Sequence, residues 1–203
     1  MVTPGRVLAV MAHPDDAELW CGGTLALHAR HADVLVAVAA HDRVRNREAA
    51  AGAAELGVDL RLIPGVDAGT VHDLITAFRP EVVVTHPTRD VHPQHAAVAR
   101  TVVEALPDVV IATGHPQRLY TCDTYNSLTL DGPVRADTIV DVTATYPTKV
   151  HALRAHASQP IETHFGPMAD TLARLWGARI GAAHAEAYTA IPILGRVPAS
   201  PCL

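Results

Sequence analysis

The sequence contains few aromatic residues and few cysteines. Of its 203 residues, 4% are aromatic, and the only cysteines are Cys21, Cys122 and Cys202. These three are scattered, form no CxxC pair and are odd in number, so we expect reduced thiols rather than a disulfide framework. With 49% hydrophobic residues, aliphatic side chains must supply the core. The length suits a single domain, which we assign to residues 1–203.

Long apolar runs and clusters of positive charge are also missing. The longest apolar stretch, near Val34–Ala40, falls far short of the roughly 20 residues that a spanning helix needs. The first residues lack the pattern of a signal peptide, so we expect a cytoplasmic protein without a membrane partner. A net charge of −5, with 16 Lys and Arg and no basic cluster, argues against nucleic acid. A small-molecule partner fits better, and homo-oligomerisation stays open.

Short β-branched runs alternate with longer segments of helical period. We expect strands at Arg6–Ala12, Asp33–Ala40, Asp59–Ile63 and Glu81–Thr85, and helices at Glu18–Arg30, Arg43–Leu56, Thr70–Phe78 and Ala96–Leu106. Weaker patterns predict strands at Val109–Thr113, Arg118–Thr124 and Thr138–Val142, and helices at Pro147–Ser158 and Met168–Ile180. This βαβ order predicts a Rossmann-like α/β fold, with a mostly parallel sheet and helices on both faces.

Ionisable side chains gather where two of these strands end. The stretch AHPDDAE places His13 and Asp16 three residues apart as the first strand turns into a helix. His92 and His95 have the same spacing before a later helix. Ligands of such sheets bind at the carboxyl ends of the strands, and His and Asp are ordinary zinc ligands. The sequence therefore predicts a metal site at this edge of the sheet.

A simpler explanation applies to single residues of this set. Asp15 or Asp16 alone would be read as a helix N-cap, and a chain with 13 histidines will place some near an aspartate. The combination at two strand ends favours a site. Six other histidines have no such group of ionisable residues at a predicted strand end. We expect each of them to be packed in the core or exposed at the surface: His41, His72, His86, His115, His151 and His164.

Several motifs resemble those of one enzyme family. Ala12–Glu18 matches the signature A-H-P-D-D-x-E, and His92–His95 resembles its distant H-P-D-H motif. Further similar segments are RVRNREAAAGAAELGV, KVHALRAHASQ and AEAYTAI. The family comprises zinc-dependent N-deacetylases related to N-acetylglucosaminyl-phosphatidylinositol de-N-acetylase, the PIG-L or LmbE-like proteins. The resemblance spans nearly the whole chain.

The resemblance implies a role for each matching residue. His13, Asp16 and His95 would hold one zinc ion, with iron or cobalt as alternatives. Asp15 would be the general base that accepts a proton from the attacking water, and His92 would donate to the developing oxyanion. Arg45 would hold the substrate or its acetyl end. The competing interpretation of Arg45 is a surface ion pair with Glu48 at i+3.

Two features separate this chain from the family pattern. Gln94 stands where relatives usually carry Asp, so it cannot supply a charge that stabilises a protonated His92. A T-x-G-E-like loop is replaced by a shorter segment containing His41 and Asp42. We expect a hydrolase that removes an N-acetyl group from an amino sugar or glycoside. The alternatives are an N-acyl hydrolase of a non-sugar amine in natural-product biosynthesis and a non-catalytic Rossmann-like module that only holds a metal.

Overall fold

The chain folds around a seven-stranded sheet with the order β3-β2-β1-β4-β5-β9-β8. The computed structural model describes residues 4–198, so Cys202 lies outside it. The strands of this sheet are β1 (Arg6–Met11), β2 (Asp33–Ala39), β3 (Asp59–Ile63), β4 (Val82–Thr85), β5 (Arg118–Cys122), β8 (Thr138–Asp141) and β9 (Ala185–Ile191). The first five run parallel, whereas β9 and β8 add antiparallel neighbours beyond β5. The prediction of a mostly parallel sheet is confirmed.

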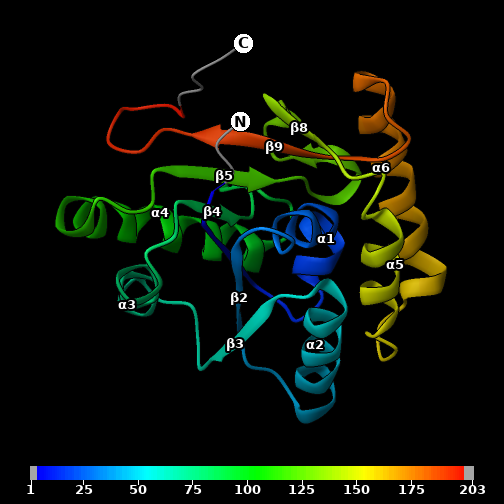
Figure 1. The fold of residues 1–203 in the computed structure, drawn as a ribbon, viewed down its shortest axis with the longest axis horizontal. Coiled ribbons are helices and arrows are strands. Elements are labelled where there is room, and N and C mark those ends of the chain that lie inside the picture. Colours follow the sequence, from blue (N-terminus) through cyan, green and yellow to red (C-terminus); the bar gives the residue numbers. More distant parts are fainter. Residues whose placement is uncertain (1–3, 199–203) are drawn as a thin grey trace.

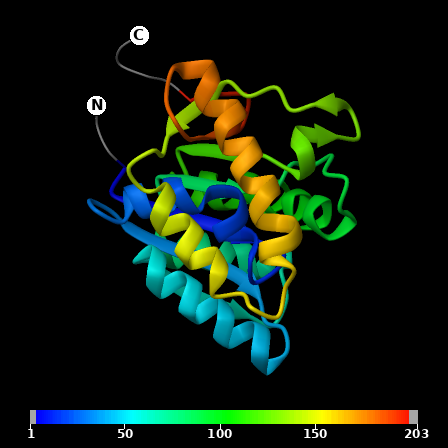
Figure 2. The same ribbon diagram turned by 90° about the vertical axis from the view of Figure 1, so that its right-hand side faces the viewer.

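Helices cover both faces of this sheet (Figures 1 and 2). They are α1 (Asp16–His28), α2 (Arg43–Leu56), α3 (Ala68–Phe78), α4 (Pro93–Thr113), α5 (Tyr146–Arg154) and α6 (Gly166–Ile180), with short turns η1 (Tyr125–Ser127) and η2 (Ile161–Phe165). A small hairpin of β6 (Leu128–Thr129) and β7 (Gly132–Pro133) lies outside the main sheet. Helices α3 and α4 lie on one face, and α1, α2, α5 and α6 on the other.

Strand β1 shows why the core has two halves. Its side chains alternate between the faces: Val7 and Met11 join the core under α1, and Leu8 and Val10 join the core under α3 and α4. A strand that is buried on both faces is apolar on both, as β1 is from Val7 to Met11. Packing on both faces holds the carboxyl end of β1 rigidly, and the motif at residues 12–18 begins there.

One expected strand is part of a helix. Val109–Thr113 continues α4, although Pro107 lies inside that helix. The reason is visible in the burial pattern, because Val102, Leu106 and Val109 line one helical face and are buried in the same core. This helical spacing outweighs both the β-branched composition of the segment and the hydrogen bond that Pro107 cannot make.

The two cysteines within the described residues, Cys21 and Cys122, are free thiols, as expected. Among residues 4–198, no helix is long and apolar enough to cross a membrane.

A buried ion pair joins α1, α5 and β9. Lys149 Nζ lies 2.6 Å from Glu186 Oε1, and both side chains are less than 5% exposed. The Glu186 carboxylate also accepts hydrogen bonds from the backbone N–H groups of Gly23 and Thr24 and from the Tyr188 hydroxyl. Every oxygen of this buried carboxylate is therefore satisfied. The pair therefore links α5 to β9, and the Glu186 carboxylate also links β9 to α1, the helix that begins within the motif at residues 12–18.

Replacing Lys149 by methionine tests this pair. Lys149→Met leaves Glu186 as a buried charge without its cation, which costs about 3–5 kcal/mol. Arg154→Met is the matched control on the same helix, because Arg154 pairs with Glu162 at the surface and such pairs contribute about 0–1 kcal/mol. Urea unfolding followed by circular dichroism measures both. Equal, small losses in the two variants would contradict a structural role for the pair.

Candidate metal centre and active site

The candidate site lies at the carboxyl ends of four strands that are neighbours in the sheet. β1 leads into His13, β2 into the helix that carries Arg45, β4 into His86, and β5 into Tyr125. The strand order reverses between β1 and β4, and ligands of open α/β sheets bind in the crevice at such a reversal. The backbone topology thus brings distant segments of the chain to one point.

The three predicted metal ligands converge there. His13 Nδ1 lies 3.1 Å from Asp16 Oδ2 and 3.1 Å from His95 Nε2. His95 Nε2 lies 3.3 Å from Asp16 Oδ1. A tetrahedral zinc ion with bonds of about 2.0 Å to N and O ligands separates those ligands by about 3.3 Å. Each of these spacings is close to that value, with the two histidines lying next to different oxygens of the Asp16 carboxylate.

Neighbouring side chains decide which ring nitrogens carry hydrogen. His13 Nε2 lies 2.6 Å from Gln94 Oε1, and His95 Nδ1 lies 3.3 Å from Asp90 Oδ2. Both oxygens can only accept, so each ring can donate an N–H outward, and its inner nitrogen is bare once any proton on it has been displaced by a metal. Two nitrogen lone pairs and the Asp16 carboxylate then face one another. Such an arrangement repels itself unless a cation lies between, and the residues therefore fit a bound metal.

The electrostatics of the cluster support the same conclusion. Burial disfavours a charged imidazole, but the hydrogen bonds that the His95 ring donates to Asp16 and Asp90 outweigh it and raise the pKa of His95 to about 9. Burial also opposes ionisation of Asp16, yet His86 and hydrogen bonds from the surrounding histidines hold the pKa of Asp16 well below its usual range. The site therefore attracts positive charge, which a proton or a metal ion can supply.

Two other groups of donors lie close enough to hold an ion: His13, His92 and His95, and Asp16, His86 and His95. Both contain a ring nitrogen that is already engaged. His86 Nε2 accepts from the Ala12 N–H at 3.1 Å, and His92 Nδ1 accepts from the Gln94 N–H at 3.3 Å. His92 keeps its Nε2 free, so the hydrogen bonds alone do not choose among the sets. We take His13, Asp16 and His95 as the ligands because the family motifs imply them and because their donor atoms lie within 3.3 Å of one another, although the Asp16 oxygens also accept from the His13 N–H and from Trp20 Nε1.

His86 was expected to lack companions, and the structure instead places it against the cluster. Its ring is fully buried and stacks on the His95 ring with centroids 3.9 Å apart. Burial lowers the pKa of His86, so the ring is neutral. The sequence signal was its position directly after β4, the same kind of strand end that drew attention to His13.

His92 lies beside the cluster as a neutral ring. Burial and the nearby His95 and His13 lower its pKa. Its Nδ1 accepts the backbone N–H of Gln94, so the proton of the neutral ring is on Nε2. Burial and the neighbouring His95 and His13 thus disfavour a protonated His92, and its role as the donor to the oxyanion stays a prediction. The Gln94 side chain contacts His13 rather than His92.

Asp15 is bound by an arginine rather than capping a helix. It occupies the N-cap position of α1, but its side chain makes no cap hydrogen bond. Its Oδ1 lies 2.6 Å from Arg45 Nη2, and both side chains are largely buried. Glu48 does not pair with Arg45, because its carboxylate accepts from the backbone and hydroxyl of Ser158. The helix with Arg45 begins at Asp42, which caps it and lies beside the exposed His41.

Tyr125 forms one wall of the site and was not anticipated from the sequence. Its ring lies parallel to the His95 ring, with centroids 5.8 Å apart, and meets Trp20 edge to face. The turn that carries it is held by buried Asp123, which accepts from the Ser127 hydroxyl and from Trp176 Nε1. Ser127 and its neighbour have positive φ, so the turn is strained next to the site.

A protein-family model described as "PIG-L: GlcNAc-PI de-N-acetylase" matches residues 8–106 of this chain. The matched segment contains every residue of the cluster, from His13 to His95, together with Asp15 and Arg45. This is the family that the sequence motifs resemble.

Solved structures show the same fold. A 4-carboxy-2-hydroxymuconate hydratase from Pseudomonas putida is 20% identical with a TM-score of 0.79, and the match covers 97% of this chain and 99% of that chain. N,N'-diacetylchitobiose deacetylase from Pyrococcus horikoshii is 20% identical with a TM-score of 0.73, covering 94% and 85%. A deacetylase of teicoplanin biosynthesis is 19% identical with a TM-score of 0.74, covering 92% and 98%.

The contact between Gln94 and His13 makes a prediction about metal affinity. Gln94→Leu removes the acceptor that holds the His13 ring, and loss of such an outer partner typically weakens metal binding about 10–100-fold. Gln94→Glu restores a stronger acceptor and should tighten binding. Competition with a chromogenic zinc chelator measures the dissociation constants.

Gln117→Leu serves as the control, since Gln117 is exposed at the opposite, amino end of β5. Zinc affinity that is the same in Gln94→Leu and Gln117→Leu would show that Gln94 does not orient His13.

Proposed function

We propose that this chain, which belongs to the PIG-L family through residues 8–106, is a metal-dependent N-deacetylase that releases acetate from an acetylated amino sugar or glycoside. The observation that carries the proposal is the meeting of three metal donors with a separate buried carboxylate, Asp15. The family description and the chitobiose deacetylase relative support an N-acetylated sugar as substrate. We infer that the protein works in the cytoplasm on a small molecule.

His13, Asp16 and His95 would hold the metal, which we take to be zinc. A zinc ion in such a site supplies a Lewis acid that polarises the amide carbonyl and lowers the pKa of water. Two histidines and one carboxylate leave a coordination position for water or substrate, as catalytic zinc sites do. A closed structural site would instead use four protein ligands.

Asp15 takes the proton of the attacking water. Its Oδ1 is bound by Arg45, and none of the described hydrogen bonds engages its Oδ2. The guanidinium fixes the orientation of the carboxylate, so that Oδ2 is available as a base. Arg45 is therefore a positioning residue for Asp15, a different role from the substrate contact that the motif implied.

His92 stabilises the oxyanion as a neutral donor. Its Nδ1 is occupied by the Gln94 N–H, and so Nε2 carries the hydrogen of the neutral ring. A neutral imidazole donates this hydrogen to the tetrahedral oxyanion without having to be protonated first. The leaving amine needs a proton, and Asp15 holds the one that it took from water.

Two other activities deserve a direct comparison. The first is hydration, because a hydratase has the same fold. The second is hydrolysis of an N-acyl group from a non-sugar amine. The test is acetate release from a panel containing N-acetylglucosamine, its glycosides, N,N'-diacetylchitobiose and acetylated alkylamines, with an unsaturated carboxylic acid as the hydration substrate. Turnover confined to the unsaturated acid would overturn the proposal.

Asp15→Asn separates metal binding from turnover. The amide keeps the size of the side chain but cannot accept a proton, and a general base contributes about 10²–10⁴-fold to the rate. We expect kcat to fall by that factor while the protein retains about one metal ion per chain. Metal analysis and acetate release measure the two quantities. Full activity in Asp15→Asn with its metal bound would refute the assignment of the base.

Arg45→Ala tests the positioning of Asp15. Loss of the 2.6 Å contact leaves the Asp15 carboxylate free to rotate away from the attacking water, so we expect kcat to fall at least tenfold with metal content unchanged. Arg47→Ala, an exposed position on the same helix, controls for general charge effects and should be silent. Equal losses in the two variants would indicate a nonspecific effect of charge.

A further inference from the structure

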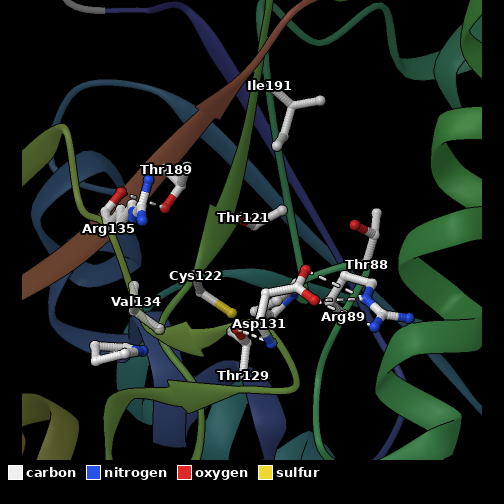
Figure 3. A pocket seen from close by; sticks show the side chains of 12 residues that line it. Thr88, Arg89, Thr121, Cys122, Thr129, Asp131, Val134, Arg135, Thr189 and Ile191 are labelled. Carbon is white, nitrogen blue, oxygen red and sulfur yellow. Dashed lines mark hydrogen bonds and ion pairs between the residues drawn. The ribbon is translucent and has the colours of Figure 1, made fainter.

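A cavity of about 370 Å³ lies beside the loop that follows β4, and none of the metal-cluster residues lines it. Its volume falls in the range of small-molecule sites, roughly 300–1,000 Å³. Its walls come from the loop after β4, the end of β5, the β6–β7 hairpin and β9 (Figure 3). The residues that carry the argument are Arg89, Arg135, Asp131, Thr88, Thr121 and Thr189.

The cavity carries an excess of positive charge. Arg135 forms no ion pair with any residue between 4 and 198, and Figure 3 shows it on the opposite side of the cavity from Arg89. Arg89 binds Asp131 at 3.2 Å, with both side chains more than half exposed. Such an exposed pair is weak, so Arg89 can exchange its partner for a ligand. Two guanidinium groups against one carboxylate give a local excess of positive charge in a chain whose net charge is −5.

The rest of the lining combines hydroxyl groups with apolar surface. The hydroxyls of Thr129 and Thr189 already donate to backbone carbonyls. None of the described hydrogen bonds engages the hydroxyls of Thr88 and Thr121, and Figure 3 draws Thr121 between the two arginines. Apolar side chains, Ile191 among them, complete the walls. A few polar groups on a partly apolar wall are typical of small-molecule sites.

We propose that this cavity is a second binding site, which takes a small molecule with an anionic group, a carboxylate or a phosphate, on a hydroxylated body. Arg135 and Arg89 bind the anion, and Thr88 and Thr121 bind hydroxyl groups. The proposal does not depend on the proposed deacetylase activity. The site shares a loop with the metal cluster, because Thr88 and Arg89 lie between His86 and Asp90.

Isothermal titration calorimetry with three probes tests the proposal. Glucose 6-phosphate and glucuronate carry the two kinds of anion, and glucose is the neutral control. The holoprotein should bind at least one anionic probe saturably, with a Kd in the millimolar range or tighter, and glucose at least tenfold more weakly. Comparison of the two anionic probes distinguishes phosphate from carboxylate.

Variants locate the binding. Arg135→Gln should raise the Kd at least tenfold, because a charge-assisted contact is lost. Thr121→Val, which keeps the shape of the side chain, should weaken the hydroxylated probes by a smaller factor. Arg61→Gln is the matched control, since exposed Arg61 lies on β3 at the opposite edge of the sheet, and it should leave the Kd unchanged. Circular dichroism verifies that each variant folds.

The titration is repeated on protein stripped of metal by a chelator and then dialysed. Binding that persists places the anion away from the metal cluster. The proposal is overturned if neither anionic probe binds, if binding disappears with the metal, if Arg135→Gln binds like the wild type, or if Arg61→Gln loses as much affinity as Arg135→Gln.

Discussion

The site depends on one constraint: the fold holds the metal donors of His13, Asp16 and His95 against one another at the carboxyl ends of β1 and β4. His13, Asp16 and His95 are held at 3.1–3.3 Å by the rigid junctions of two neighbouring strands and their helices. Their hydrogens are directed outward by Gln94 and Asp90. A proton or a metal ion between these donors relieves their mutual repulsion. The fold therefore creates an affinity for metal before any substrate binds.

The carboxylates around the metal cluster serve two purposes, metal binding and proton transfer. Asp16 and Asp90 supply the negative charge that raises the pKa of His95, whereas Asp15 is held apart from them by Arg45. Both aspartates of the first motif are nearly fully buried, yet each has its own cationic or donor partner. Because partners and not exposure set the behaviour of buried carboxylates, adjacent residues can act as ligand and as base.

The sequence predicted the architecture well because strand and helix periods are local. β-branched runs that are buried on both faces marked β1, β2 and β4. The strand order, with its reversal between β1 and β4, was not predicted, because the βαβ pattern does not say on which side of β1 each strand lies. Val109 was placed in a strand because its composition is β-like, and only its packing against Val102 and Leu106 shows that the helix continues.

Partners of side chains were less predictable than their positions. The motifs identified the cluster, but spacing along the chain says nothing of the direction in which a side chain turns. Gln94 was therefore assigned to His92, two residues away, whereas its amide meets His13 from another strand end. Tyr125 could not have been found, because its ring reaches the site through a strained turn held by Asp123 and Trp176. Both errors concern contacts between segments that are distant in sequence.

Anomalous diffraction at the zinc absorption edge from crystals of the zinc-loaded protein tests the central claim most directly. The account predicts one strong peak about 2 Å from His13 Nδ1, His95 Nε2 and an Asp16 oxygen, with Gln94 and Asp90 still bound to the outer nitrogens of the two rings. A peak coordinated by His92 or His86 in place of Asp16 or His13, or no peak at this edge of the sheet, would contradict it.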